Sequence, residues 1–379
     1  MDDTEFHGRK AVGVTCIVHK SLRKQVMEFL EETGVGKIYV EAGKSERLFI
    51  RSRPFGLPGT RQVLHDSPAE IFRFSISTGD TQYVLNSLIA AAELDVQGRG
   101  MIFSQKIYEY SKDSLPIIPA GEKSGEIDTK YSLLPGLSLI TCILSRPGSG
   151  EELSRTALEL GTCVPIITNG RGTGMRDNLG LLRITIPSEK EIVQLIVPEY
   201  DADNIIQLLI EEVKLNLPGR GFLFRTPIGM GVVDTRLRIG RQEHAASMEQ
   251  IISAIDELKM GTHWRKRFSG TENSSFGNPS HLLFNYKAIS FVCREGKGDS
   301  LVNRAMEKGA PGATISRISC LNLQDREGDS AARERNVICV PNNLAEKVID
   351  AIFHEEEIIE QFLDHLWIQD APSVFSYIR

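Results

Sequence analysis

The chain has 379 residues, a length that ordinarily corresponds to two or three domains. Hydrophobic residues make up 41% of it and charged residues 25%, a balance that excludes global disorder and a coiled coil. Its 44 Lys and Arg against 50 Asp and Glu give a net charge of −6, so we do not expect non-specific binding to nucleic acids or to acidic membranes.

Cysteine usage and hydropathy bear on the compartment. The six cysteines are scattered along the chain and form no C-x-x-C pair. No apolar run reaches the roughly 18 residues that would span a bilayer. The acidic residues 1–5 differ from the basic start of a secretory signal peptide. We therefore expect a reduced, cytoplasmic protein that does not insert into a membrane.

The first segment, residues 9–110, reads as strand, helix, strand, strand, helix, strand. Its expected strands cover residues 11–18, 37–40, 71–77 and 101–108, and its expected helices cover 22–34 and 81–94. The first helix ends at Gly34, and glycine suits the left-handed residue that closes a helix. Residues 43–68, between the second and third strands, form a polar excursion that we expect to be a long exposed loop.

A linker over 111–136, which carries prolines and charges, leads to a second segment, 137–264, with the same order of elements. Its expected strands cover 137–144, 164–168, 191–197 and 222–225, and its expected helices end at Gly161 and cover 203–215. This segment also carries an additional strand over 232–239 and an additional helix over 245–260. The helix is expected because its apolar residues lie on one face.

A linker over 265–286, rich in Ser, Asn and Gly, leads to the third segment, 287–379. Its expected strands cover 288–292, 313–318, 336–340 and 374–378, and its expected helices end at Gly309 and cover 343–366. The three segments therefore share one order of elements, βαββαβ.

Direct self-similarity supports a repeat. Residues 145–161 and 293–309 align without a gap, and seven positions are identical. These are Arg146/Arg294, Gly148/Gly296, Gly150/Gly298, Leu153/Leu301, Ala157/Ala305, Glu159/Glu307 and Gly161/Gly309. Helices that alternate with short strands in this order predict an α+β fold of three tandem ferredoxin-like βαββαβ units.

Five stretches of the second segment stand in the order and spacing of one protein family. They are NGRGTGMRD (169–177), GLL (180–182), EKEIV (189–193), LIVP (195–198) and PGRGF (218–222). On these residues the segment resembles the PII nitrogen-regulatory signal proteins and their PII-like relatives. The likeness spans about 137–238. The third segment shares residues 294–298 and 309–314 of the pattern, and the first mainly 98–103.

The resemblance implies an assembly and a function. The three units would form an intramolecular pseudo-trimer, with their open sheet faces packed around a three-fold axis. Short linkers would favour it, because they keep the units at an effective concentration of roughly millimolar. Adenine nucleotides (ATP, ADP or AMP) would bind as effectors between neighbouring units, and a long loop would dock onto a target protein.

Candidates for nucleotide or anion binding are glycines and arginines in turns, because glycines let successive N–H groups converge on a phosphate and arginine supplies positive charge. They are Gly98, Arg99, Gly100, Gly170, Arg171, Gly172, Gly174, Gly219, Arg220, Gly221, Arg236 and Arg238. The resemblance implies a phosphate-binding loop at 98–100 and 219–221, and phosphate contacts from 236 and 238. The family's lysine after that loop is replaced by Met101 and Phe222. Tight structural turns, or a site for another small anion, are the alternatives.

The excursion over 43–68 is the candidate for docking, because loops held by a rigid scaffold commonly carry binding residues. It contains five Lys or Arg against two Asp or Glu. The docking candidates are Arg47, Arg51, Arg53, Phe55 and Arg61, and the expected target is a transporter or an enzyme. The alternative is a solvated loop without a partner.

No pattern typical of catalysis or metal binding occurs: the sequence lacks G-x-S-x-G, a Walker A loop and a paired-histidine zinc motif. We therefore expect a non-enzymatic PII-like regulatory protein that has no catalytic residues, metal or fixed cofactor, and binds no nucleic acid. Two alternatives stay open. One is a structural adaptor without a ligand, and the other is an enzyme or metal-binding protein on a ferredoxin-like fold.

Overall fold

The computed structural model describes residues 8–52, 60–111, 114–116, 118, 131–174, 189–240, 282–322, 331–353 and 362–377. The first segment contains β1 (Arg9–His19), η1 (Lys20–Leu22), α1 (Arg23–Glu32), β2 (Lys37–Ser52), β3 (Thr60–Ile76), η3 (Thr78–Asp80), α2 (Thr81–Ala92) and β4 (Gly100–Tyr110). The second contains β5 (Leu134–Leu144), α4 (Ser149–Leu160), β6 (Ile166–Gly174), β7 (Glu189–Pro198), η5 (Glu199–Asp201), α5 (Ala202–Glu212), β8 (Gly221–Val232) and β9 (Arg238–Gly240). The third contains β10 (Tyr286–Arg294), α7 (Gly298–Glu307), β11 (Gly312–Asn322), β12 (Ala332–Pro341), α8 (Asn342–Phe353), β13 (Leu363–Ala371) and β14 (Ser373–Ser376).

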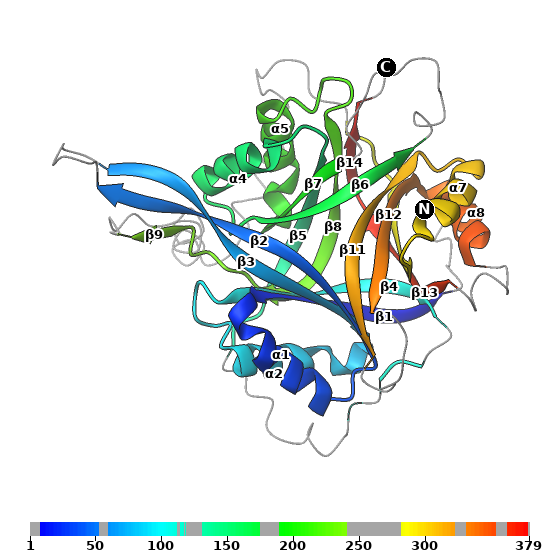
Figure 1. Ribbon diagram of the computed structural model, residues 1–379, viewed down its shortest axis with the longest axis horizontal. Helices are drawn as coiled ribbons and strands as arrows, with labels where there is room; N and C mark the ends of the chain where they lie inside the picture. The colour runs from blue at the N-terminus through cyan, green and yellow to red at the C-terminus, as the bar shows by residue number, and fades with distance from the viewer. Residues whose placement is uncertain are drawn as a thin grey trace.

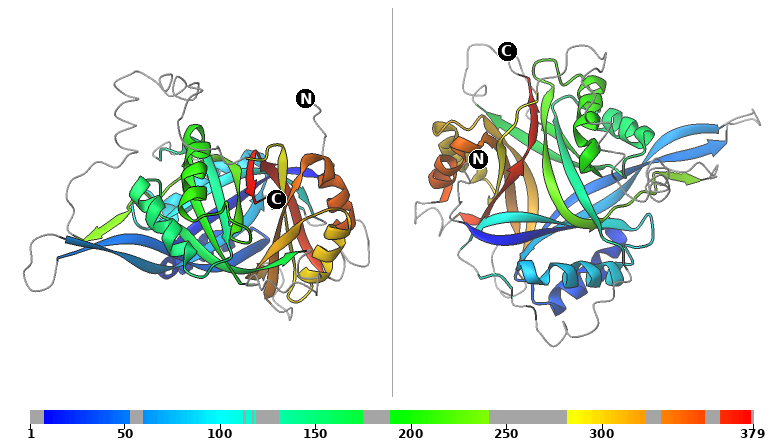
Figure 2. Two further views of the ribbon diagram at one scale, coloured as in Figure 1. Left: turned by 90° about the horizontal axis from the view of Figure 1, so that it is seen from above. Right: turned by 180° about the vertical axis from the view of Figure 1, so that it is seen from behind.

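Each segment contributes a four-stranded antiparallel wall. The strand orders are β2-β3-β1-β4, β6-β7-β5-β8 and β11-β12-β10-β13. Two helices cover the outer face of each wall, and the inner faces of the three walls look toward one another (Figures 1 and 2). Because side chains alternate along a strand, every second residue points to the helices and the others point inward.

The apolar core lies between each wall and its helices. In the second segment it includes Leu153 and Ala157 of α4 together with Ile206 and Leu209 of α5, all completely buried. Burying one such Leu or Ile side chain stabilises the fold by about 1.5–3 kcal/mol. The first and third segments have equivalent clusters of their own under α1 and α2, and under α7 and α8.

The walls are joined by hydrogen bonds along their edges. β4 pairs with β8 and with β13, β2 pairs with β6 and with β11, and β6 pairs with β11, all antiparallel. A ring of ten antiparallel strands therefore closes in the order β8-β5-β7-β6-β2-β11-β12-β10-β13-β4, and β1 and β3 run between β4 and β2 as a further wall. The result is a closed β-barrel.

The predicted fold class, three tandem ferredoxin-like units that form an intramolecular pseudo-trimer, is wrong. The chain folds into one mostly β barrel with six α-helices in its described part. The physical reason is the cost of open edges: in separate four-stranded sheets, each edge strand would present unpaired N–H and C=O groups. Every residue except proline carries both groups, so no side-chain pattern indicates that strands of different segments will pair.

The expected loop at 43–68 is largely a hairpin. β2 and β3 pair from Tyr39↔Arg73 out to Ser52↔Thr60, and the hairpin projects from the body of the barrel (Figure 1). The short strand β9 runs parallel to its outer part, with Leu48 opposite Arg238. The polar composition of this stretch suggested a loop, but residues 45–48 of β2 are buried, and Leu48 packs in the apolar core of the second segment.

Several smaller expectations have clear outcomes. Gly34, Gly161 and Gly309 all have positive φ at or just after the ends of their helices, as predicted. The helix expected over 343–366 is too long, because residues 363–371 form β13. No helix in the described part of the chain is long and apolar enough to cross a membrane. The helix expected at 245–260 and most of the linker at 265–286 lie outside the described residues.

Candidate functional site

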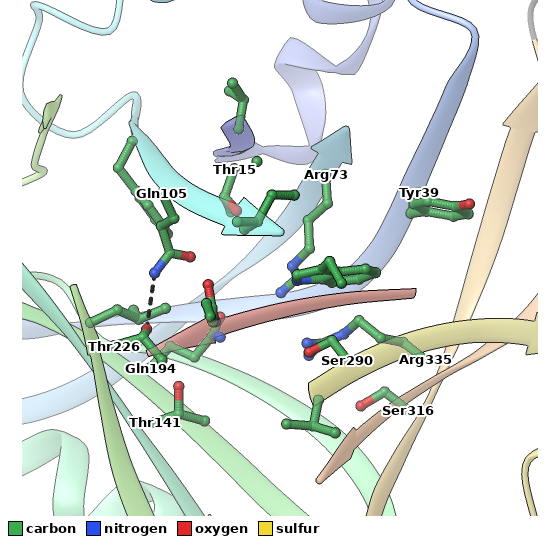
Figure 3. Close-up of a pocket in the computed structure, with 18 of the residues that line it drawn as sticks. Thr15, Tyr39, Arg73, Gln105, Thr141, Gln194, Thr226, Ser290, Ser316 and Arg335 are labelled. Carbon is green, nitrogen blue, oxygen red and sulfur yellow. Dashed lines mark hydrogen bonds between the residues drawn. The ribbon is translucent and has the colours of Figure 1, made fainter. Parts of the chain in front are cut away.

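The lumen of the barrel contains a cavity of about 70 Å³. Side chains from all three walls line it (Figure 3). The polar ones are hydroxyls, amides, one imidazole and two arginines: Thr15, Tyr39, Arg73, Ser75, Gln105, Thr141, Gln194, Thr226, Ser290, Thr314, Ser316, Arg335, His365 and Gln369. Ligand sites combine an apolar lining with a small number of placed polar groups, and this cavity has both.

Strand alternation places the two arginines in the lumen. Arg73 on β3 lies between Phe72 and Phe74, which pack outward against α1 and α2. Arg335 on β12 lies across the lumen on the third wall, and the two side chains point toward the same region of the cavity (Figure 3). A charged residue flanked by buried aromatic residues therefore points inward.

Glu41 of β2 sits where the three walls meet and contacts both arginines. Its Oε2 accepts a hydrogen bond from Arg73 Nη1 at 2.6 Å and lies 3.6 Å from Arg335 Nη2. Thr168 of the second wall also hydrogen-bonds to this carboxylate. Burial alone would raise the pKa of Glu41, but the two guanidinium groups hold it below its ordinary value.

Burial of the two arginines beside a single carboxylate destabilises the fold. Arg335 is 8% exposed, and its burial together with the nearby charge of Arg73 lowers its pKa to about 10. One carboxylate serves two cations, and no Asp or Glu is among the described residues that line the cavity. Arg73 Nη2 and Arg335 Nε have no hydrogen-bond partner in the protein. Buried charged donors without partners cost several kcal/mol unless something else satisfies them.

A second charged cluster lies at the lumen wall. His365 Nε2 lies 2.6 Å from Glu109 Oε1, and Arg9 Nη2 lies 2.7 Å from Glu109 Oε2. The His365 ring packs on Tyr39 and Trp367. Burial would raise the pKa of Glu109, but hydrogen bonds and charge from His365 and then Arg9 lower it to about 2. This cluster therefore leaves its single carboxylate well compensated.

The predicted anion turn at Gly98 is filled by a carboxylate of the chain itself. Asp234 Oδ1 accepts hydrogen bonds from the backbone N–H groups of Gly98 (3.1 Å) and Arg236 (3.0 Å). Its Oδ2 accepts one from Arg47 Nη2 at 2.5 Å. The structure thus brings together Gly98, Arg236 and Arg47, which the sequence had assigned to two different functions. Arg99 turns away and donates to Ala92 O at 2.9 Å.

The glycines that close the two turns are required by backbone packing. A Cβ at Gly100 would lie 2.2 Å from Ile17 O, and a Cβ at Gly221 would lie 2.0 Å from Ile143 O. Both residues also have positive φ. This favours the alternative of tight structural turns at these two positions. Gly219 has positive φ, and the carbonyl of Arg220 accepts a hydrogen bond from Ser145 N at 2.9 Å.

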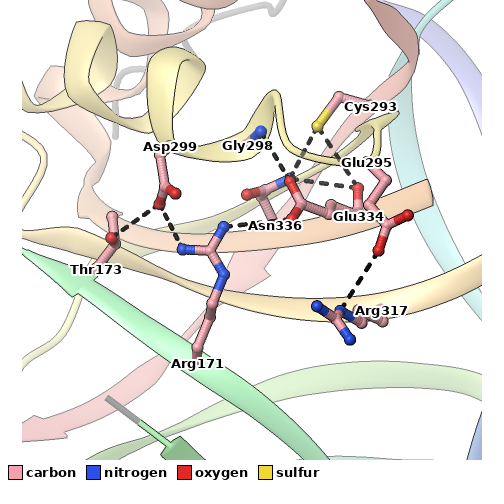
Figure 4. Close-up of polar contacts among 9 residues, drawn as sticks. All are labelled: Arg171, Thr173, Cys293, Glu295, Gly298, Asp299, Arg317, Glu334 and Asn336. Carbon is pink, nitrogen blue, oxygen red and sulfur yellow. Dashed lines mark hydrogen bonds and ion pairs between the residues drawn. The ribbon is translucent and has the colours of Figure 1, made fainter. Parts of the chain in front are cut away.

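The stretch from Gly170 to Gly174 is extended strand rather than a turn, so its N–H groups do not converge on one point. Arg171 reaches across to the third wall (Figure 4) and pairs with Asp299 (2.6 Å) and Glu334 (3.3 Å). Thr173 Oγ1 donates to Asp299 Oδ1 at 3.0 Å. Gly172 leaves room for Lys190, whose Cε would lie 2.5 Å from a Cβ there. The charge of Arg171 is therefore matched within the protein.

The docking candidates separate along the hairpin. Arg47 is 7% exposed and held by Asp234, so it is not available at the surface. Arg51 is exposed and stacks over the Phe49 ring at 5.0 Å. Arg61 lies opposite Arg51 in the β2–β3 register, and Arg238 lies on β9 opposite Leu48. Arg53 and Phe55 lie outside the described residues.

The lumen arginines were missed by the sequence interpretation. The signal for Arg73 was a lone Arg within Ile71-Phe72-Arg73-Phe74, whereas Arg335 stands in the polar run 333–336 and gave no comparable signal. Such a residue in an apolar strand indicates an inward polar contact, but the strand alone does not reveal the partner.

No protein-family model matches the sequence, and no curated protein matches it. Among the described residues, no group of three or more His, Cys, Asp or Glu side chains could hold a metal ion. None of the six cysteines, all of which are among the described residues, forms a disulfide bond. The site therefore has to be understood from its own chemistry.

Proposed function

We propose that the chain is a non-enzymatic regulatory protein that binds a small effector in the barrel lumen and signals to a target protein through the β2–β3 hairpin. One observation carries this proposal: the same two strands form part of the lumen wall and the projecting hairpin. Tyr39 and Arg73 lie in the cavity at the inner ends, and the pairing continues without interruption to Ser52 and Thr60 at the outer ends.

Ion pairs join the base of the hairpin to the second segment, and a ligand in the lumen could change them. Arg47 is held by Asp234, and Lys44 Nζ lies 3.3 Å from Glu151 of α4. A ligand that shifts β2 or β3 in the lumen would bias these contacts. An effector changes such an equilibrium only if it binds the two arrangements with different affinity.

Two observations bear on the identity of the effector. The lumen offers unsatisfied donors, whereas Asp234 already occupies the N–H group at the Gly98 turn. An adenine nucleotide at Gly98 would have to displace that carboxylate.

The occupancy of the Gly98 turn by Asp234 favours a second candidate function, a structural adaptor without a ligand. In such an adaptor, Asp234 serves only to fix the hairpin.

Hydrogen exchange of the hairpin tests the proposal. The full chain is incubated separately with ATP, ADP, AMP, sodium butyrate and sodium phosphate at millimolar concentration, and amide exchange is followed over residues 43–52 and 60–68. We expect at least one of these compounds to slow or accelerate exchange there by several-fold. Unchanged exchange with a compound that calorimetry shows to bind would contradict the signalling function, and failure of every compound to bind would favour the adaptor.

A further inference from the structure

The strongest unexplained feature of the molecule is an excess of positive charge inside the lumen. Arg73 and Arg335 both contact Oε2 of Glu41, so the buried group of three carries a net positive charge. The cluster around Glu109 pairs its one carboxylate with Arg9 and His365 and has no negative charge to spare. Nothing among the described residues lining the cavity supplies the missing anion.

The hydrogen bonds of the two arginines also indicate a missing anion. Arg73 Nη2 and Arg335 Nε are buried and have no protein acceptor. Each side chain is about nine-tenths buried, so bulk water is largely excluded from them. Guanidinium groups bind carboxylates and phosphates through paired N–H donors, and such charge-assisted bonds are roughly twice as strong as neutral ones.

We propose that the lumen binds a small oxyanion, a carboxylate or a phosphate group, between Arg73 and Arg335. The inference rests on the proposed function, because it names the chemistry of the effector that the lumen takes. The hydroxyls of Ser290 and Ser316 line the same cavity as the arginines, as do the apolar side chains of Val337 and Ile192. A ligand with an anionic end and a short hydrocarbon body matches this lining.

The proposal makes a direct prediction for the wild-type chain. In a chloride-poor buffer of fixed ionic strength, sodium butyrate or sodium phosphate raises the midpoint of thermal unfolding by at least about 2 °C at saturating concentration. Butyramide, which has the shape of butyrate without its charge, leaves it unchanged. Comparison of butyrate with phosphate identifies which oxyanion the site prefers.

Two variants with a matched control locate the site. Arg335→Gln should raise the dissociation constant measured by calorimetry at least about tenfold, because one of the two cations is lost. Arg317→Gln makes the same chemical change on β11, where the side chain is 86% exposed and pairs with Glu295, and should leave binding unchanged. Glu41→Gln removes the competing carboxylate and should tighten binding at least about threefold, which keeps the test valid if the Arg335 variant does not fold.

The outcomes separate this inference from the function on which it rests. Butyrate or phosphate that binds through Arg335 without altering hairpin exchange supports the oxyanion site and overturns the signalling function. If a nucleotide alters hairpin exchange and neither oxyanion binds, the signalling function is supported and the oxyanion site is overturned. The oxyanion site is also overturned if butyramide stabilises the chain as much as butyrate, or if Arg317→Gln weakens binding as much as Arg335→Gln.

Discussion

Asp234 Oδ2 accepts a hydrogen bond from Arg47 Nη2 at 2.5 Å, and this contact joins the base of the β2–β3 hairpin to the segment that follows β8. Both side chains are almost completely buried, at 9% and 1% exposure. The other oxygen of Asp234 takes two backbone N–H groups. One carboxylate therefore fixes a turn of the first segment, the chain after β8 and the hairpin at the same time.

Removing the Asp234 carboxylate should strongly lower the free energy of unfolding. Asp234→Ala leaves Arg47 buried without its partner and two N–H groups without an acceptor, so we expect the free energy of unfolding to fall by about 3–5 kcal/mol in urea denaturation. Glu151→Gln, which removes only a surface partner of Lys44, should cost less than about 1 kcal/mol. Equal losses in the two variants would show that the Arg47–Asp234 pair adds nothing beyond a surface contact.

Stability should depend on Glu109 in acid. The folded pKa of Glu109 is about 2, below the ordinary value of 4.5, so its contribution is fully present above pH 4.5 and is lost as the pH falls toward 2. The difference in unfolding free energy between wild type and Glu109→Gln should shrink from about 3 kcal/mol at pH 5 to near zero at pH 2. A parallel series with Glu28→Gln, at an exposed helical pair, should show no such trend.

Thiol reactivity should follow burial. Burial raises the pKa of Cys16 and of Cys142 to about 12, so at pH 8 neither is a thiolate in the folded protein. Cys320 is more exposed, and we expect it to react first with a disulfide reagent such as DTNB. The remaining thiols should react at the rate of unfolding. Replacement of Cys320 by Ser should abolish the fast phase, and a fast phase that persists would contradict the burial of the other five.

The turn glycines can be tested by adding one methyl group. Gly221→Ala places a Cβ against Ile143 O at a residue with φ of +142, so we expect a loss of at least about 2 kcal/mol in unfolding free energy. Gly79→Ala meets no atom within 4 Å and has an ordinary φ. It should change stability by less than about 0.5 kcal/mol, and a comparable loss there would mean that steric contact is not the cause.

The local features of the fold were predictable because they depend on nearby residues. The helix ends at Gly34, Gly161 and Gly309 follow from glycine's freedom at positive φ, and the alternation around Arg73 follows from strand geometry. The pairing of β4 with β8 and β13 was not predictable, because edge strands recognise one another through backbone groups. Asp234 contacts Gly98, which lies 136 residues away in the sequence, and no local pattern predicts that contact.

The candidate site shows the same division. That Arg73 would be buried could be read from its apolar neighbours, whereas Arg335 stands between Glu334 and Asn336 and gave no such signal. That one carboxylate would serve both arginines depends on three walls meeting at Glu41. The glycine-rich stretch at 170–174 suggested an anion loop, yet the extra strand pairing with β11 straightens it. Motif and spacing describe one segment at a time, whereas the lumen is made by three.

The closed ring also sets an order of events during synthesis. β13, residues 363–371, is the last of its ten strands along the chain, and it pairs with both β10 and β4. Until the ribosome has released those residues, the backbone edge of β4 lacks one of its partners and the ring cannot be complete. A nascent chain that stalls before residue 363 therefore exposes a sheet edge with unpaired N–H and C=O groups. Such an edge is prone to aggregation, and chaperones or proteases can recognise it.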